Sequence, residues 1–205
     1  MRIESRAVAV QGPHSPLLGP TSATIESGTV TIVDGPPGQG HTAFSLVLAG
    51  RLIPSSGEVV VDDEPDAERL RREVAVIDVP AVSEPDDVVT LATAIGEELA
   101  MARRPARRSH VLAYLEEHEA QEWARTRVED VPPDVRFRLL ADVAAQRPGI
   151  TALVLCCPDR YGAGPESSLD VARTLAEAGY AVCLQMTTNT LLGVGDSRAT
   201  LGRAR

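Results

Sequence analysis

Two glycines, a basic residue and a hydroxyl residue stand at a fixed spacing near the start of the chain. They belong to the run Gly35-Pro36-Pro37-Gly38-Gln39-Gly40-His41-Thr42. A phosphate-binding loop (P-loop) requires Gly, four residues, Gly, Lys and then Ser or Thr, and only the lysine is missing here. No other lysine can replace it, because each of the 20 basic residues is an arginine. The motif therefore predicts the local fold of a phosphate-binding loop and leaves its chemistry in question.

The sequence around this loop supplies the elements that such a loop needs. Residues 30–33 are predicted to form a β-branched strand, and residues 42–50 a buried helix that ends at Gly50. Hydrophobic periodicity and breakers predict further strands at 58–61, 74–79, 150–157 and 180–186, and helices at 64–73, 88–102, 110–123, 134–146 and 169–178. On one face of the first long helix we expect Val88, Leu91, Ile95 and Leu99. Residues 194–205 are expected to be a loose tail or a final frayed strand.

Strands alternate with helices, and a helical block interrupts the alternation after residue 80. This order predicts an α/β fold with a P-loop NTPase core, a mostly parallel sheet and a helical insertion. A chain of 205 residues is long enough for one well-buried core and short for two. We therefore expect a single domain over residues 1–205, with its core at 1–80 and 145–205 and the insertion at about 81–144.

Charge and composition exclude several classes of protein. A net charge of −9 argues against nucleic acid as a partner, because a nucleic-acid binder needs a basic footprint. No stretch approaches the ~20 apolar residues of a membrane span, and the N-terminus lacks a signal-peptide core, so a cytoplasmic location is expected. Cys156, Cys157 and Cys183 lie in apolar runs, which favours buried reduced thiols over disulfides.

Two surface features of the helical block leave alternatives open. The only dense basic cluster is formed by Arg103, Arg104, Arg107 and Arg108. A solvated loop between two helices is the simpler explanation, and a patch for a partner or a lipid is the other. Trp123 likewise fits either the core of the helical block or a docking surface.

The order of these features resembles the ATP-binding cassette (ABC) ATPase family along nearly the whole chain. The resemblance rests on the glycine loop, on Glu26-Ser27-Gly28 before its strand, and on Leu48-Ala49-Gly50 and Pro54-Ser55-Ser56-Gly57-Glu58 after it. Residues 141–148 resemble the helix that follows the family's signature sequence, and residues 151–158 resemble its second acidic strand. Residues 41–51 are similar to small actinobacterial cassettes associated with large membrane proteins.

This chain departs from the family at each of its catalytic positions. No Leu-Ser-Gly-Gly-Gln signature is present near residues 130–135, where Pro132 and Pro133 stand instead. In the family the strand that ends here in Cys156-Cys157 carries an acid that organises Mg²⁺ and one that polarises the attacking water. The position of the family's glutamine is occupied by Val79, and the position of its switch histidine aligns with Thr188. The resemblance therefore implies a degenerate cassette, a pseudo-ATPase with no catalytic residue.

A vestigial phosphate site remains possible on the amides of the loop, since a helix N-terminus favours anions. Its residues would be Gly35, Gly38, Gln39, Gly40, His41, Thr42 and Ala43. ATP binding is then expected to be weak, with Mg²⁺ bound only with the nucleotide and Thr42 as its one candidate ligand. His41 could face a phosphate as a partial cation or be a neutral side chain in a decayed pocket.

Three further carboxylate or imidazole side chains bear on the nucleotide site. Asp34 is interpreted as a turn or capping residue. Asp159 is the one carboxylate that could replace the lost acids, although a surface turn residue is the simpler interpretation. In the family an aromatic side chain stacks on adenine near residues 9–16, and only His14 is available there.

Three hypotheses of function follow. The first is a degenerate nucleotide-binding subunit that acts as a structural or regulatory partner of a membrane complex, located at the inner face of the plasma membrane. Its helical insertion, with Arg103, Arg104, Arg107 and Arg108, would contact the membrane subunit, and a second cassette would complete a homodimer or heterodimer. The second is a freestanding cytosolic adaptor that binds no nucleotide. The third is an ABC transporter ATPase with atypical catalytic residues.

Overall fold

The computed structural model describes residues 1–187 and 197–202. Its first half contains β1 (Arg2–Gln11), β2 (Pro16–Glu26), β3 (Val30–Gly35), α1 (Gln39–Leu48), β4 (Ser56–Val61), α2 (Ala67–Glu73) and β5 (Val74–Ile77). Helices follow as α3 (Leu91–Met101), α4 (Arg108–Glu117), the 3₁₀ turns η1 (Gln121–Trp123) and η2 (Val128–Asp130), and α5 (Pro133–Ala145). The chain continues with β6 (Ala152–Cys156), η3 (Pro158–Tyr161), α6 (Pro165–Glu177), β7 (Ala181–Thr187) and β8 (Ser197–Thr200).

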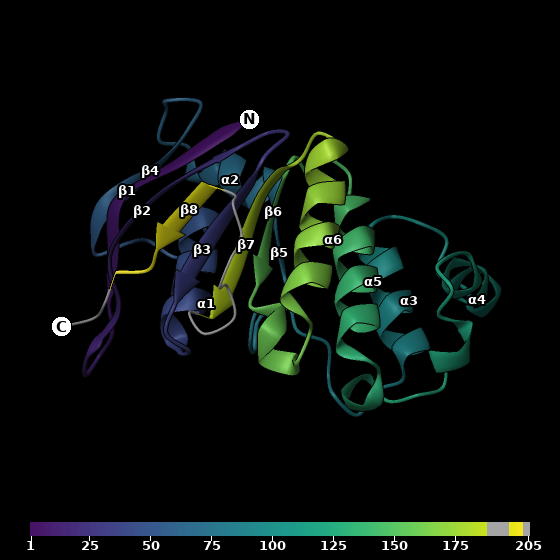
Figure 1. Cartoon of the computed structure of the whole chain (residues 1–205). Coiled ribbons are helices and arrows are strands. Elements are labelled where there is room, and N and C mark those ends of the chain that lie inside the picture. The colour runs from purple at the N-terminus through teal and green to yellow at the C-terminus, as the bar shows by residue number, and fades with distance from the viewer. Residues whose placement is uncertain (188–196, 203–205) are drawn as a thin grey trace.

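A five-stranded parallel sheet forms the centre of the molecule in the order β5-β6-β7-β3-β8 (Figure 1). Every residue of β6 is buried, and the strand pairs with β5 on one side and β7 on the other. This confirms the interior strand that the apolar run at 150–157 predicts, because a parallel strand covered on both faces reads as a continuous apolar segment. The predicted α/β fold with a mostly parallel sheet is thus confirmed.

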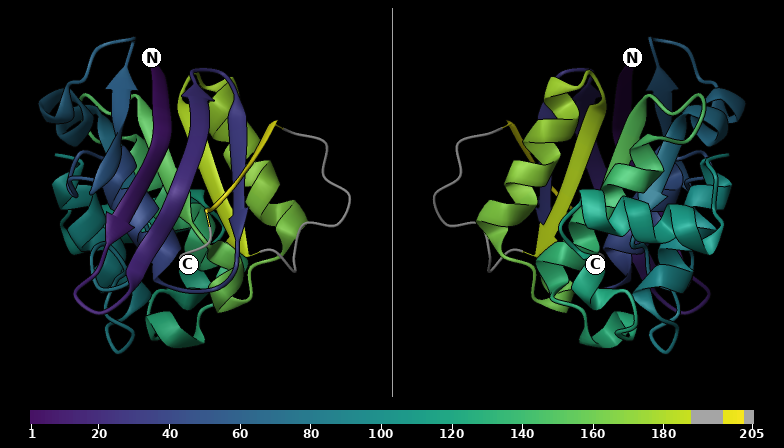
Figure 2. Two further views of the ribbon diagram at one scale, coloured as in Figure 1. Left: turned by 90° about the vertical axis from the view of Figure 1, so that its left-hand side faces the viewer. Right: turned by 90° about the vertical axis from the view of Figure 1, so that its right-hand side faces the viewer.

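A second, three-stranded antiparallel sheet in the order β2-β1-β4 packs at one end of the molecule (Figure 2). The strand predicted at 58–61 corresponds to β4, whereas the long strands β1 and β2 were not predicted. Burial in β1 alternates at Ile3 and Ser5, then shifts register to Val8 and Val10. The shift coincides with a positive φ of 47° at Ala7, and such a bulge breaks the two-residue period on which sequence recognition of a strand depends.

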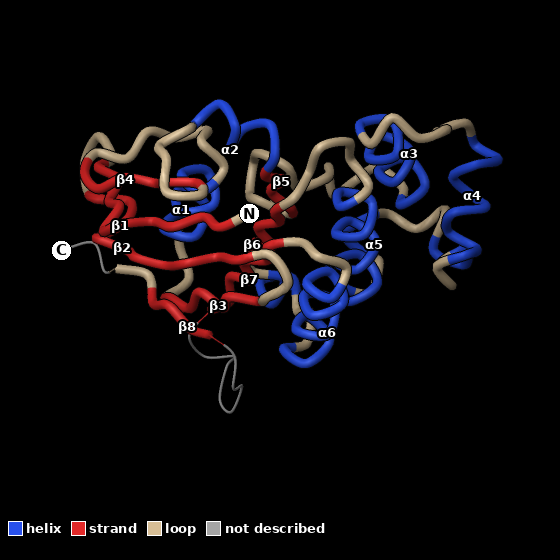
Figure 3. Tube along the Cα trace, turned by 90° about the horizontal axis from the view of Figure 1, so that it is seen from above, coloured by secondary structure: helices blue, strands red, loops and turns tan. Residues whose placement is uncertain are grey.

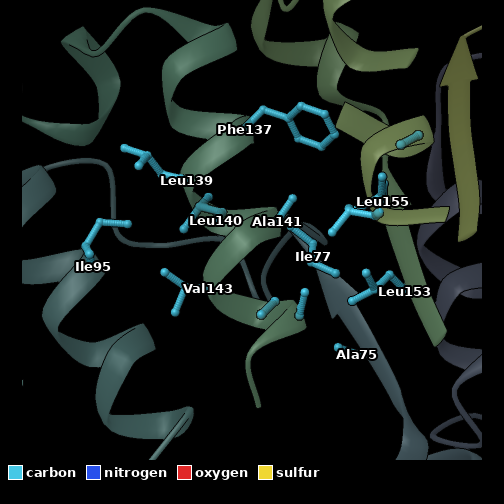
Figure 4. Close-up of a cluster of buried hydrophobic side chains, with 14 of the residues drawn as sticks. Ala75, Ile77, Ile95, Phe137, Leu139, Leu140, Ala141, Val143, Leu153 and Leu155 are labelled. Atoms are coloured by element: carbon cyan, nitrogen blue, oxygen red, sulfur yellow. The ribbon is translucent and has the colours of Figure 1, made fainter. Parts of the chain in front are cut away.

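The two faces of the parallel sheet are covered by different layers (Figures 1 and 3). On one face, α3, α5 and α6 form a continuous apolar core with the sheet. In the close-up, Ala141 of α5 points toward Ile77 of β5 and Leu155 of β6, whereas Val143 lies on the side of Ile95 of α3 (Figure 4). On the other face, α1 and the antiparallel sheet enclose a second core. Helix α4 lies at the end of the molecule opposite the antiparallel sheet (Figure 3).

Several predicted boundaries differ from the observed ones. Helix α1 begins at Gln39, three residues before the predicted start, because Gly38 with φ 148° lets the chain turn directly into the helix. Placing Val88 on the buried face of the next helix was wrong, since Val88 is 62% exposed and α3 begins only after its N-cap Thr90. Residues 197–200 form β8, so part of the predicted tail is the final strand.

Candidate functional site

The glycine loop connects the end of β3 to the start of α1, as the motif requires. Gly35 is buried at the strand end, whereas Gly38 and Gln39 are exposed and Gly40 is half-buried. Gly38 has φ 148° and ψ −173°, a backbone conformation that is open almost only to glycine. A Cβ at Gly35 would lie 2.8 Å from the side chain of Leu201, so the chain after β8 packs directly against this loop. The strand, glycine loop and helix that the motif predicts are therefore present.

His41, in the place of the lysine, points into the protein. The side chain is 3% exposed, and its Nδ1 lies 2.9 Å from Oε1 of Gln185 on β7. Its Nε2 lies 3.4 Å from the carbonyl oxygen of Gly35 at the base of the loop. Burial lowers the pKa of His41, which keeps the imidazole neutral at physiological pH. A neutral, inward-bonded ring cannot supply the charge that a lysine brings to a phosphate.

A closed set of hydrogen bonds holds His41 in this orientation. The amide Nε2 of Gln185 donates to the hydroxyl of Ser45 at 2.8 Å, and that hydroxyl donates to the carbonyl of His41 at 2.9 Å. Since the amide nitrogen of Gln185 is used in this way, its oxygen accepts the Nδ1 proton of His41. Gln185 and Ser45 were missed in the sequence. Each could have been noticed as a polar residue in an otherwise apolar element, Gln185 in the strand β7 and Ser45 in the helix α1.

Two other residues of the predicted phosphate site follow on α1. Thr42 is half-buried in the first turn, and Ala43 is buried. Mg²⁺ prefers oxygen ligands in octahedral geometry, most often from carboxylates and phosphates. Across residues 1–187 and 197–202, no group of three or more His, Cys, Asp or Glu side chains is arranged to hold a metal ion. Thr42 could therefore ligand Mg²⁺ only together with the oxygens of a bound phosphate.

Cys156 and Cys157 stand at the end of β6, where the family resemblance implies two acids. Both are buried, and Cys183 on β7 is buried as well; all three are free thiols, as predicted. Cys157 adopts a left-handed conformation with φ 48°, and its amide donates to the carbonyl of Gln185 at 3.0 Å. A hydrogen bond to Cys156 and burial raise the pKa of Cys157, and burial raises the pKa of Cys183. The hydrogen bond from Cys157 lowers the pKa of Cys156. None of the three side chains carries the oxygen that Mg²⁺ prefers as a ligand.

Asp159 lies in η3 directly after these cysteines and is half-buried. Its Oδ2 accepts hydrogen bonds from the amide of Thr187 at 2.9 Å and from the hydroxyl of Thr187 at 2.5 Å. The carboxylate thus anchors the end of β7. Asp159 is therefore more than the solvated turn residue of the simpler interpretation. Thr188, the position of the switch histidine, lies outside the described residues.

The remaining two residues, Asp34 and His14, lie in β3 and in the turn between β1 and β2. Asp34 is half-buried in β3, and its carboxylate accepts a hydrogen bond from the hydroxyl of Thr200 at 2.9 Å. His14 is exposed in the turn between β1 and β2. Neither residue contacts the other, and the bond from Thr200 gives Asp34 a structural partner in β8.

The segment at the signature position is bonded to its own chain. Pro132 is the N-cap of α5 and Pro133 its first residue, so the first turn has no amide donor at residue 133. Oδ1 of Asp134 accepts from the amide of Gly164 at 2.9 Å and from the hydroxyl of Ser167 at 2.5 Å. These bonds fix the start of α5 to the start of α6, and no serine or glycine faces outward in that turn.

The basic cluster lies between α3 and α4. Arg103, Arg104, Arg107 and Arg108 are all exposed, and none makes a side-chain hydrogen bond or ion pair with the described residues. Beside them, a groove of about 780 Å³ runs between α3 and α4, and Arg108 lines one wall. Trp123 is half-buried against the core of the helical layer, so its ring serves packing. The cluster is therefore a surface of unneutralised cations.

Solved structures resemble this chain over nearly its whole length. A structure from Pyrococcus furiosus that is assigned as an ABC transporter ATP-binding protein matches with a TM-score of 0.68 at 16% identity, over 98% of this chain and 97% of that one. A nucleotide-free ATP-binding cassette from an ABC transporter gives 0.64 at 14%, over 100% and 92%. An ATP-binding subunit of an ABC transporter gives 0.62 at 14%, over 92% and 80%. At these identities the likeness establishes the fold.

Sequence comparison reaches less of the chain. The hemin import ATP-binding protein HmuV of Myxococcus xanthus is 36% identical over 76 residues, which are 37% of this chain and 28% of that protein. The match therefore spans less than a third of the relative's length. No protein-family model matches the sequence. Among residues 1–187 and 197–202, no helix has the length and apolar character needed to cross a membrane. The chain therefore has an ABC ATPase-like fold, with an antiparallel sheet, a five-stranded parallel sheet and a layer of helices.

Proposed function

We propose that this chain is a catalytically degenerate cassette that acts as a structural or regulatory partner of a membrane protein complex. The observation that carries the proposal is the inward orientation of His41, which is neutral and bonded to Gln185 in the position of the phosphate-binding lysine. Phosphoryl transfer depends on cations and on an oriented water at the transferred group. His41 and the buried thiols of Cys156 and Cys157 supply none of these.

The fold still permits a nucleotide in a limited way. The amides from Gly38 to Thr42 stand at the N-terminus of α1, where the helix dipole favours a phosphate. A bound phosphate would supply the oxygens that Mg²⁺ needs, and Thr42 would add one hydroxyl. We therefore propose weak ATP binding with Mg²⁺ bound only with the nucleotide, and no catalytic role for either.

The helical segment supplies the docking surface in this proposal. We keep the division into a core at 1–80 and 145–205 and an insertion at about 81–144 within one domain. Arg103, Arg104, Arg107 and Arg108 form a positive surface on a chain of net charge −9, and no carboxylate of the described residues neutralises them. Such a surface fits an acidic cytosolic segment of a membrane protein, since complementary charge governs association rate and salt sensitivity.

We further propose that the protein lies in the cytoplasm at the inner face of the plasma membrane. Because residues 41–51 resemble actinobacterial cassettes, we propose an actinobacterial source. A second cassette, identical or different, would complete the complex. Nucleic acid is not a partner in this proposal, because its phosphates would meet a predominantly acidic surface.

Co-purification with native membranes tests the docking surface. Replacement of Arg103, Arg104, Arg107 and Arg108 by glutamate should abolish membrane association and leave the melting temperature nearly unchanged, since these side chains are exposed and unbonded. Replacement of the same four by lysine is the matched control, because it keeps the charge. If the glutamate variant still associates, or the wild type never does, the freestanding adaptor becomes the better hypothesis.

A further inference from the structure

Five side chains from four segments meet at the carboxyl end of β5. Asp78 directly follows β5, and Glu84 belongs to the segment that leads to α3. Arg136 comes from the first turn of α5, whereas Arg160 and Tyr161 come from η3 after β6. We call these five residues the interface cluster. Two carboxylates and two guanidinium groups balance in charge, and the cluster joins the sheet to the helical segment formed by α3, α4 and α5.

The centre of the interface cluster is a buried ion pair. Arg136 donates from its terminal nitrogen to Oδ1 of Asp78 at 2.6 Å, and the two side chains are 5% and 2% exposed. Asp78 has φ 57°, a left-handed conformation that is uncommon for aspartate. Its carbonyl oxygen also accepts a hydrogen bond from Arg160 at 3.1 Å. The side chain of Asp78 is thus bonded to α5, and its backbone carbonyl is bonded to η3.

Both guanidinium groups lie over the aromatic ring of Tyr161. The guanidinium carbon of Arg136 lies 3.8 Å from the ring centroid, and that of Arg160 lies 4.4 Å from it. The hydroxyl of Tyr161 donates to Glu84 at 2.5 Å, and Arg160 reaches the same carboxylate at 3.4 Å. The cluster therefore also ties the segment before α3 to the chain after β6.

We infer that the interface cluster holds the helical segment in one fixed orientation on the sheet, independently of any nucleotide. A ligand can reorient two parts of a protein only if their interface has a second arrangement of similar free energy. Sliding α5 away from β5 would leave Asp78 and Arg136 as unpaired buried charges, so such an arrangement is strongly disfavoured. In this inference the Asp78–Arg136 pair specifies one packing more than it stabilises the fold, because the desolvation of two buried charges offsets much of their attraction.

This inference rests on the proposed function in one respect: a fixed segment presents the arginine surface between α3 and α4 in a constant position. The nearest alternative is that the cluster adds general stability and leaves the orientation free. Stability and orientation can be separated, because a neutral pair of similar size can replace the ion pair without leaving a buried charge. The double variant Asp78→Asn/Arg136→Met is such a replacement.

The test measures the distance between spin labels on the full chain. One label is attached at Glu68→Cys on α2 and the other at Ser109→Cys on α4, both exposed positions, whereas the three native thiols are buried. We expect one narrow distance distribution that does not change when ATP and Mg²⁺ are added in excess. In the double variant the distribution should broaden at least twofold in width.

The control removes an exposed pair in the same segment. Arg127 and Glu129 lie 3.5 Å apart with side chains 62% and 45% exposed, and Arg127→Met/Glu129→Gln should leave the distribution narrow. A shift of the wild-type distribution with ATP and Mg²⁺ overturns the inference even if the double variant fails to fold. An unchanged distribution in the folded double variant overturns it as well. Membrane association is measured in parallel, so that narrow distances without association count against the proposed function alone.

Discussion

The Nδ1 atom of His41 lies 2.9 Å from Oε1 of Gln185, so the residue at the lysine position of the glycine loop is bonded to the neighbouring strand β7. A lysine at this position would carry a charge that cannot be buried without a partner. The imidazole can be buried because Gln185 accepts its proton and Ser45 in turn orients Gln185. The loop is thereby connected to the core of the protein and not directed toward a ligand.

Replacement of His41 by alanine should destabilise the fold. It leaves the buried oxygen of Gln185 without its donor, and an unsatisfied buried polar group costs about 1–3 kcal/mol. The free energy of unfolding from urea titration near neutral pH measures this. His14→Ala is the control, because His14 is exposed and a surface change of this kind stays within about 0.5 kcal/mol. Equal stability of the two variants would contradict the role assigned to the His41–Gln185 bond.

Purified protein should hydrolyse ATP no faster than buffer alone. Cys156 and Cys157 are buried and carry no carboxylate oxygen to orient water or hold Mg²⁺, and His41 is neutral and turned inward, so none of the three supports phosphoryl transfer. Phosphate release over several hours measures the rate. Turnover that disappears in Thr42→Ala or Gly40→Val would sink the prediction, because it would assign real catalysis to this loop.

Nucleotide binding should be weak or absent, and Mg²⁺ should change it little. Any affinity comes from the amides at the start of α1, because Asp159 is already bonded to Thr187 and Thr42 offers a single hydroxyl. Calorimetric titration with ATP, with and without Mg²⁺, measures both effects. Micromolar affinity that Mg²⁺ enhances would mean that His41 or Asp159 reorients to rebuild a site.

The ion pair of Asp78 should make stability depend on pH. Burial raises the pKa of Asp78 to about 6, although Arg136 lowers it in part. A carboxyl group in an unfolded chain titrates near pH ~4. The folded protein therefore binds this proton more tightly, and the stability linked to it is present below about pH 4 and is lost as the pH rises through about 6.

Asp78→Asn removes this titration and makes the effect measurable. The free energy of unfolding of wild type minus that of Asp78→Asn should fall by roughly 2 kcal/mol between about pH 4.5 and about pH 7. Urea titrations at several pH values and constant ionic strength give the difference. A difference that stays constant across this range would show that Arg136 fully offsets the desolvation of Asp78.

Much of the fold could be predicted from local patterns. The strand at 30–33, the glycine loop and the apolar run at 150–157 each carry their own boundaries in glycine and proline, and each corresponds to a described element. The strands β1 and β2 were missed because the buried positions of β1 shift from odd to even residue numbers at Ala7. The pairing of β1 with β2 shifts its register at the same place. A period of two residues that breaks in mid-strand is not visible in the sequence alone.

By itself the sequence determined which residues stand where the family resemblance implies a lysine, two acids and a signature, since this is a matter of residue identity. Tertiary structure alone decided where the replacements point. His41 finds Gln185 at a separation of 144 residues, and Asp78 finds Arg136 at a separation of 58. Such partners are brought together by the packing of α1 and α5 against the sheet, and only burial makes an uncompensated polar group costly enough to fix their pairing.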